Sequence, residues 1–321
     1  MSKFMKKLLF LLLLFACFTL PAECLAQKNV RIKISVLDKS GRAVSGLVKE
    51  DLALFEGKTP LEIVSVEPLL NKPCAVLLLL DTSLSQAEIL PWTKEFSAAF
   101  VQRGLQKDDV VAVAKFSNAL EILRSFTSEI PAAVSTIDAI QVDFPPGYIS
   151  NGRVGLPPPR VSPANRSAMP GVTNLWSALS LIGENDFTGV GDRRKTIVLL
   201  TDGVETVKGA SPSEAADSLN TAGISVYAIG IGDDLYEKIN DDDLRKIALA
   251  TGGREFFPSG KKDLAQTVEK LKQWLASEYI LTFSVNTPNK NKPGKLKLQI
   301  TSADKEKKDH QLSYPQKYPI N

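Results

Sequence analysis

Hydrophobic and polar residues follow two different patterns along the chain. From Val30 to Val36 every second residue is apolar, which is the period of a strand with one buried face. Further short strands are expected near Leu52–Phe55 and Leu61–Val66. Residues 27–70 are therefore predicted to form a small β unit.

Between residues 71 and 278 the pattern changes to continuous apolar runs that alternate with amphipathic stretches. A run such as Ala75–Leu80 is typical of a strand that is buried on both faces. Further strands are expected at Val110–Phe116, Leu120–Phe126, Thr196–Leu200, Ser225–Ile229 and Arg254–Phe257, and helices at Trp92–Arg103, Ile130–Ile140, Leu175–Ile182, Ser213–Ala222, Asp242–Thr251 and Asp263–Ser277. This alternation predicts a doubly wound, Rossmann-like α/β sheet. Only three residues separate Leu120–Phe126 from Val110–Phe116, so Leu120–Phe126 must be an antiparallel edge strand in a hairpin.

Residues 141–172 interrupt this pattern. They contain seven prolines and four glycines, which exclude a helix or a central strand. An insertion of this length in a compact domain is usually functional or disordered. In residues 279–321, Tyr279–Val285 and Lys295–Ile300 have no helix between them and are predicted to form a β hairpin. We expect this segment to pack with residues 27–70 as one β-sandwich-like unit.

Residues 1–26 have the pattern of a cleaved secretory signal. A basic start precedes the apolar run Leu8–Leu20, which is too short to span a bilayer as a helix. A retained membrane anchor is the alternative interpretation. No integral membrane segment is expected after cleavage, and the protein is predicted to be exported to the periplasm, the cell surface or the medium.

Charge and composition exclude several classes of function. Residues 1–26 hold three lysines and Glu23, so their removal lowers the net charge from +3 to +1, too little to attract nucleic acid. The only histidine, His310, lies in the lysine-rich tail, which excludes Ser-His-Asp and Cys-His catalysis. No Gly-x-x-x-x-Gly-Lys loop is present, so no nucleotide is expected.

Oxygen-bearing side chains follow the ends of two predicted strands and open one predicted helix. Asp81, Ser83 and Ser85 follow the strand Ala75–Leu80, Asp202 follows Thr196–Leu200, and Thr173 opens the helix at Leu175. Each segment alone is also compatible with an ordinary cap or turn. In a doubly wound sheet, however, these two strands are neighbours and their connections leave in opposite directions. We therefore expect the two carboxylates and three hydroxyls to meet in one crevice.

Such an all-oxygen set suits a hard divalent cation. Mg²⁺ fits best, Mn²⁺ or Ca²⁺ is possible, and zinc is not expected. Because the set has only two negative charges, it would leave the ion electrophilic, with a position open for an Asp or Glu carboxylate of a protein partner.

These segments resemble the von Willebrand factor type A domain and its metal-ion-dependent adhesion site. The resemblance covers about Pro73–Ser277 and depends on the Asp81-x-Ser83-x-Ser85 motif, Thr173 and Thr201-Asp202-Gly203. It implies that Ser83 and Ser85 coordinate directly, that Thr173 does so when ligand is bound, and that Asp81 and Asp202 act mostly through water. Gln86 stands where many relatives have Met, outside the ligand set.

The flanking segments resemble a secreted bacterial family of such domains, well represented in acidobacteria, through Gly41–Leu47 and Asp51–Gly57. We therefore expect a non-enzymatic, exported adhesion or protein-interaction module. One alternative is an envelope assembly subunit with a structural metal. Another is a metal-dependent hydrolase, for which Glu205 is the nearest candidate base.

Overall fold

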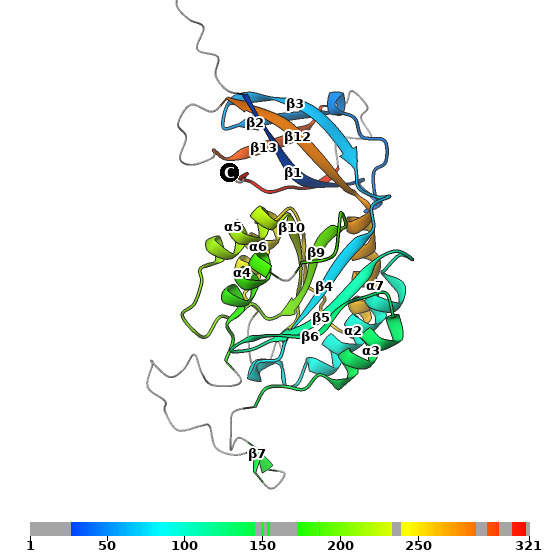
Figure 1. Ribbon diagram of the computed structural model, residues 1–321, viewed down its shortest axis with the longest axis vertical. Coiled ribbons are helices and arrows are strands. Elements are labelled where there is room, and N and C mark those ends of the chain that lie inside the picture. Colours follow the sequence, from blue (N-terminus) through cyan, green and yellow to red (C-terminus); the bar gives the residue numbers. More distant parts are fainter. Residues whose placement is uncertain are drawn as a thin grey trace, which may run out of the picture.

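The computed structural model describes residues 27–144, 149–150, 153–154, 172–185, 187–232, 239–286, 294–301 and 310–318. The predicted signal segment 1–26 and most of the insertion 141–172 lie outside the described residues. Two separate sheets organise the chain (Figure 1).

The first sheet lies at the centre of an α/β domain. Its strands are β4 (Cys74–Asp81), β5 (Val110–Phe116), β6 (Leu120–Thr127), β9 (Arg194–Thr201), β10 (Ile224–Gly230) and β11 (Glu255–Phe256). Their spatial order is β11-β10-β9-β4-β5-β6. All neighbours are parallel except β5 and β6, which pair antiparallel. This is the predicted Rossmann-like sheet with one antiparallel edge strand.

Helices cover both faces of this sheet (Figure 1). They are α2 (Leu90–Arg103), α3 (Ile130–Ala139), α4 (Leu175–Asn185), α5 (Pro212–Ala222), α6 (Asp241–Ala250) and α7 (Lys261–Ala276), with a short 3-10 helix η2 (Leu84–Gln86) after β4. Alternate side chains of β4 enter two apolar clusters. Leu78 and Leu80 pack with residues of α2, α3 and α7, whereas Leu77 and Leu79 pack with residues of α4, α5 and α6. Burial on both faces explains why β4 is a continuous apolar run.

The second sheet is built from both ends of the described chain. Its strands are β1 (Gln27–Leu37), β2 (Leu52–Glu56), β3 (Thr59–Pro68), β12 (Glu278–Asn286), β13 (Leu296–Ile300) and β14 (Gln311–Ser313), with the 3-10 helix η1 (Lys49–Asp51) before β2. The order is β13-β2-β3-β12-β1-β14. A separate two-stranded sheet, β7 (Ile149–Ser150) and β8 (Arg153–Val154), lies within the insertion.

The predicted hairpin between residues 279–285 and 295–300 is wrong. Strand β12 pairs with β1 and β3, whereas β13 pairs with β2 at one edge of the sheet. Placed between β1 and β3, β12 buries Leu281 and Phe283 in the apolar cluster of this unit. Strands from residues 27–70 and from residues 279–321 lie together in one six-stranded sheet and share that cluster, which is consistent with the expected unit built from both segments.

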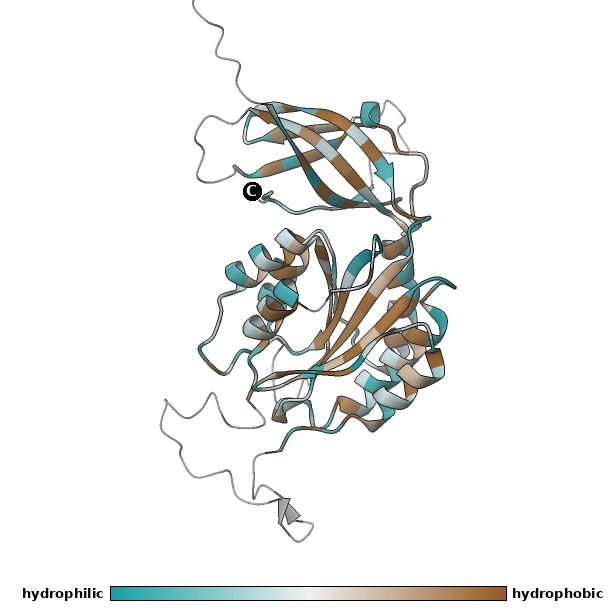
Figure 2. Cartoon of the chain, in the orientation of Figure 1, coloured by the Kyte–Doolittle hydropathy of each residue, from teal (hydrophilic) through white to brown (hydrophobic). Residues whose placement is uncertain are grey.

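The distribution of hydropathy agrees with this architecture. In Figure 2 the central strands of the α/β sheet are the most hydrophobic elements, and hydrophilic segments lie on the outer faces of the helices. Among the described helices, none has both the length and the apolar character that crossing a bilayer requires.

Candidate metal centre

The two predicted carboxylate ligands lie at the same edge of the α/β sheet. Asp81 is the last residue of β4, and Asp202 directly follows β9. These strands are parallel neighbours and are paired up to Leu80 and Leu200, so they end side by side. Both carboxylates are buried, with exposed fractions of 0% for Asp81 and 1% for Asp202.

Asp81 is held by donors at both of its oxygens. Its Oδ1 accepts a hydrogen bond from the backbone N–H of Ser83 at 2.9 Å, and its Oδ2 accepts one from Thr201 Oγ1 at 2.5 Å. Burial, followed by the negative charge of Asp202, raises the pKa of Asp81 to about 7. The pKa rises although hydrogen bonds oppose it, so the neighbouring protein groups do not compensate the charge of this carboxylate. A bound divalent cation would compensate this charge.

Asp202 is also held at both oxygens. Its Oδ1 accepts from the backbone N–H of Val204 at 2.9 Å, and its Oδ2 accepts from Gln86 Nε2 at 2.8 Å. The same Nε2 lies 3.4 Å from Ser85 Oγ, and the Gln86 side chain is buried. From the sequence, Gln86 was expected to lie outside the ligand set. One feature of the sequence could have indicated its role: Gln86 directly follows Ser85, at a position where many relatives have the apolar residue Met.

The two serine hydroxyls are spaced as neighbouring ligands of one small ion. Ser83 Oγ and Ser85 Oγ are hydrogen-bonded to each other at 3.1 Å. In an octahedral Mg²⁺ site with bonds of about 2.0–2.1 Å, adjacent ligand oxygens lie about 2.9 Å apart. The serine pair therefore fits a small hard cation with little adjustment.

Thr173 is fixed by the loop that follows Asp202. Its backbone N–H donates to Thr206 Oγ1 at 2.7 Å, and its carbonyl accepts from the N–H of Thr206 at 3.0 Å. Thr173 is 2% exposed. The loop after β9 thus positions both Asp202 and Thr173. The role of Thr206 cannot be read from the sequence, because a loop threonine has no distinctive local pattern.

Glu205 caps the helix that follows Thr173. Its Oε2 accepts from the backbone N–H groups of Leu175 at 2.7 Å and Trp176 at 3.3 Å, at the start of α4. Burial raises the pKa of Glu205 to about 7, although these two bonds oppose the shift. This geometry gives Glu205 a role in holding the start of α4.

The described ends of the insertion 141–172 are anchored beside the centre. At its start, Asp143 accepts from Thr82 Oγ1 at 2.7 Å, Ser117 Oγ at 2.8 Å and Lys115 Nζ at 2.7 Å. Behind it, the backbone N–H of Asn174 donates to the Ser117 carbonyl at 2.8 Å. Because Thr82 lies between Asp81 and Ser83, the insertion leaves and rejoins the domain at the rim of the candidate site.

The chemistry of this centre depends on hydroxyls as much as on carboxylates. Within the described ranges, no three His, Cys, Asp or Glu residues gather into a group able to hold a metal. The run Asp241–Asp243 instead forms the first turn of α6, where Asn240 accepts a hydrogen bond from the N–H of Asp243. Two carboxylates with three hydroxyls remain the candidate ligand set.

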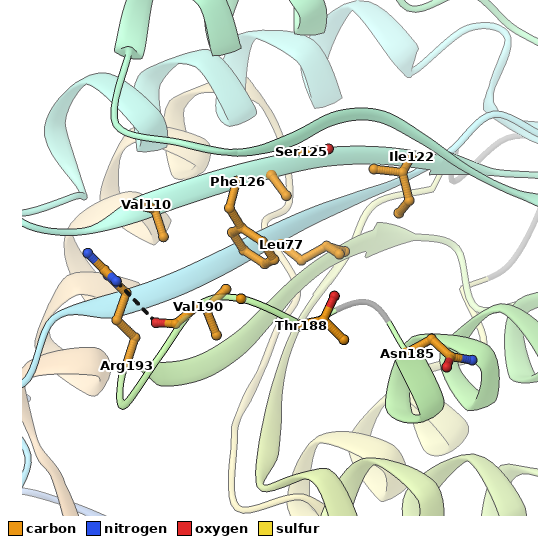
Figure 3. A pocket seen from close by; sticks show the side chains of 11 residues that line it. Leu77, Val110, Ile122, Ser125, Phe126, Asn185, Thr188, Val190 and Arg193 are labelled. Atoms are coloured by element: carbon orange, nitrogen blue, oxygen red, sulfur yellow. Dashed lines mark hydrogen bonds between the residues drawn. The ribbon is translucent and has the colours of Figure 1, made fainter.

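A separate cavity of ≈ 480 Å³ lies between β6 and the connection from α4 to β9 (Figure 3). It is lined by apolar residues such as Leu77 and Phe126 and by polar residues such as Asn185, and Arg193 donates to the Val190 carbonyl at 3.1 Å at one end. None of the five predicted ligands lines it, so this cavity is not part of the metal centre.

Comparison with known families defines the class of this domain. The family model of the von Willebrand factor type A domain matches residues 163–271. The matched segment contains Thr173 and Asp202, whereas Asp81, Ser83 and Ser85 lie before it. The chain therefore contains a von Willebrand factor type A domain, within the α/β unit whose sheet is described above.

Similarity to individual proteins is low. No curated protein is significantly similar to the chain. Among solved structures, the conserved hypothetical protein BatB from Bacteroides thetaiotaomicron is 21% identical, over 62% of this chain and 98% of that chain, with a TM-score of 0.44. The von Willebrand factor type A protein from Catenulispora acidiphila is 13% identical, over 86% and 71%, with a TM-score of 0.49.

The proximal thread matrix protein 1 of the mussel byssus, whose structure has a zinc-occupied MIDAS motif, is 18% identical, over 64% of this chain and 48% of that chain, with a TM-score of 0.48. All three TM-scores are below 0.5, so no property of these proteins is transferred to this chain.

Proposed function

We propose that the chain is an exported, non-enzymatic protein-interaction module that binds an Asp or Glu carboxylate of a partner protein through a divalent cation. The cation, Mg²⁺ in first place with Mn²⁺ or Ca²⁺ as alternatives, would be held by five residues: Asp81, Ser83, Ser85, Thr173 and Asp202. The proposal depends on one observation: two buried carboxylates, of which burial raises the pKa of Asp81 to about 7, lie at the same edge of the sheet as two hydroxyls 3.1 Å apart.

The ligand chemistry supports binding of an anionic partner group. A bound divalent cation supplies a Lewis-acid centre at which a carboxylate oxygen of a partner is stabilised. The protein residues contribute two formal negative charges, which only balance a divalent ion, and three neutral hydroxyls, which donate weakly to it, so the ion stays electrophilic toward an incoming carboxylate. Oxygen-only donors favour Mg²⁺, Mn²⁺ or Ca²⁺ over softer metals.

The surroundings of the centre support recognition of a protein. Thr173 lies two residues before α4, and Asp143 anchors the start of the insertion. The two ends of the insertion therefore lie where a bound partner would contact the domain. Export is proposed from the pattern of residues 1–26.

The test is a partner screen with and without EDTA. Envelope proteins of the native organism are passed over the immobilised wild-type protein, over Asp81→Ala and over Asp192→Ala. The last variant is the control, because the Asp192 side chain is 90% exposed. We expect captured proteins to be released by EDTA, restored by Mg²⁺ and absent from Asp81→Ala. Capture that is indifferent to EDTA and to Asp81→Ala would refute the proposal. Metal-dependent stability without any captured protein would favour the structural-metal alternative.

A further inference from the structure

We propose that Gln86 is a positioning residue that gives the metal centre its preference for Mg²⁺ over Ca²⁺. This proposal rests on the proposed function, because it assumes that the predicted residues bind a cation. It assigns a role to a side chain outside the five predicted ligands.

The Gln86 side chain is fixed at both of its ends. Its backbone N–H donates to the Ser83 carbonyl at 3.0 Å, and its carbonyl accepts from the N–H of Ile89 at 3.2 Å, which holds the residue in the turn of η2. Its amide group then donates to Asp202 Oδ2 at 2.8 Å. The side chain is 1% exposed, so water does not compete for this bond.

This bond connects parts of the centre that are distant in the sequence. Gln86 and Asp202 are separated by 116 positions, and the amide also lies 3.4 Å from Ser85 Oγ. Since Asp202 Oδ1 is held by the N–H of Val204, the carboxylate is held at both oxygens and cannot rotate freely. Gln86 therefore sets the position of the third segment relative to the serine pair.

A centre held in this way favours the smaller ion. Mg²⁺ requires near-octahedral geometry with bonds of about 2.0–2.1 Å, whereas Ca²⁺ takes bonds of about 2.3–2.6 Å in flexible sites. Widening the centre for Ca²⁺ would strain the contacts of Gln86 with Ser85 and Asp202.

Substitution of Gln86 by Met tests this role, because Met keeps the length of the side chain but cannot donate. Mg²⁺ and Ca²⁺ affinities are measured by isothermal titration calorimetry for the wild-type protein, Gln86→Met and a matched control, Gln102→Met, which changes an exposed glutamine of α2. We expect Gln86→Met to weaken Mg²⁺ binding about tenfold, as the loss of an outer hydrogen bond to a ligand typically does. Ca²⁺ binding should change less, so the ratio of the two affinities falls.

Thermal unfolding in EDTA shows whether the variant is folded. If Gln86→Met does not fold, Gln86→Asn replaces it, since the shorter amide keeps a donor but does not reach Asp202, and the same fall in the affinity ratio is expected. A folded variant whose Mg²⁺-to-Ca²⁺ ratio stays within about twofold of the wild-type ratio overturns the proposed role of Gln86 and leaves the metal centre intact. Wild-type protein that binds neither cation overturns the proposed function, and this inference with it.

Discussion

The Arg194 guanidinium donates to the Glu278 carboxylate at 2.8 Å, and the two side chains are 4% and 0% exposed. Arg194 begins β9 of the α/β domain, whereas Glu278 begins β12 of the second sheet. The Tyr227 hydroxyl donates to the other oxygen of Glu278 at 3.0 Å. This buried network joins the two units at the ends of the strands opposite to the candidate metal centre.

Substitution Arg194→Met should destabilise the protein strongly. It leaves the buried Glu278 carboxylate with only the Tyr227 hydroxyl and the more distant Lys33 Nζ, at 3.9 Å. Loss of one member of a buried ion pair costs about 3–5 kcal/mol. The affinity for Mg²⁺ should not change, because Arg194 lies at the start of β9 and Asp202 follows its end. Urea unfolding measures the first effect and calorimetric titration the second.

The exposed ion pair between Lys72 and Asp192, with side chains 44% and 90% exposed, provides the control. Substitution Asp192→Asn should leave the unfolding midpoint unchanged, because exposed pairs contribute little to stability. Equal effects of the buried and the exposed substitution would contradict the assigned role of the Arg194–Glu278 pair.

Mg²⁺ should stabilise the protein against heat, and Asp81→Ala should remove this effect. A ligand that binds only the folded state at 100 times its dissociation constant adds about 2.7 kcal/mol to the free energy of unfolding. Differential scanning calorimetry with EDTA and with Mg²⁺ should therefore show a higher Tm in Mg²⁺ for the wild type alone. The same rise in Asp81→Ala would place the cation elsewhere.

The position of the centre follows from the sequence for a simple physical reason. A continuous apolar run such as Ala75–Leu80 must be a strand covered on both faces, and the alternation of strands and helices places it beside Thr196–Leu200. The structure brings Asp81 and Asp202 to this edge. The serine spacing in Asp-x-Ser-x-Ser is local, so it is visible in the sequence as well.

The remaining features depend on partners that are distant in the chain. Periodicity shows that residues 279–285 form a strand but not which strand lies beside it, so the hairpin prediction failed when β12 paired with β1 and β3. The bond from Gln86 to Asp202 spans 116 positions, and that from Thr173 to Thr206 spans 33. No local pattern predicts such contacts.

Stability should fall with rising pH because of Glu205. Burial raises the pKa of this carboxyl from 4.5 to about 7 in the folded protein, so the folded state binds the proton more tightly than the unfolded state does. The contribution of Glu205 to stability is complete below pH 4.5 and is lost as the pH rises through about 7. Glu205→Gln keeps an acceptor for the N–H of Leu175 but has no proton to lose.

Urea unfolding of the wild-type protein and of Glu205→Gln, in EDTA and at a series of pH values, tests this prediction. The free energy of unfolding of wild type minus that of Glu205→Gln should decrease from about pH 4.5 to about pH 7 and be constant above. The variant Glu184→Gln, at an exposed position of α4, controls for the loss of a charge. A difference that does not vary with pH would show that burial does not raise the pKa of Glu205.

Phe283→Ala should lower the free energy of unfolding of the second sheet. Phe283 is fully buried, and its strand β12 joins the two ends of the chain in that sheet. Its ring packs edge-on against Tyr318, with centroids 5.5 Å apart. Truncation of a buried Phe costs about 3–5 kcal/mol, since the space it leaves is only partly filled. Val64→Ala on β3, at a residue 40% exposed, should cost far less. Chemical unfolding measures both, and similar losses for the two variants would show that Phe283 is not part of a tightly packed core.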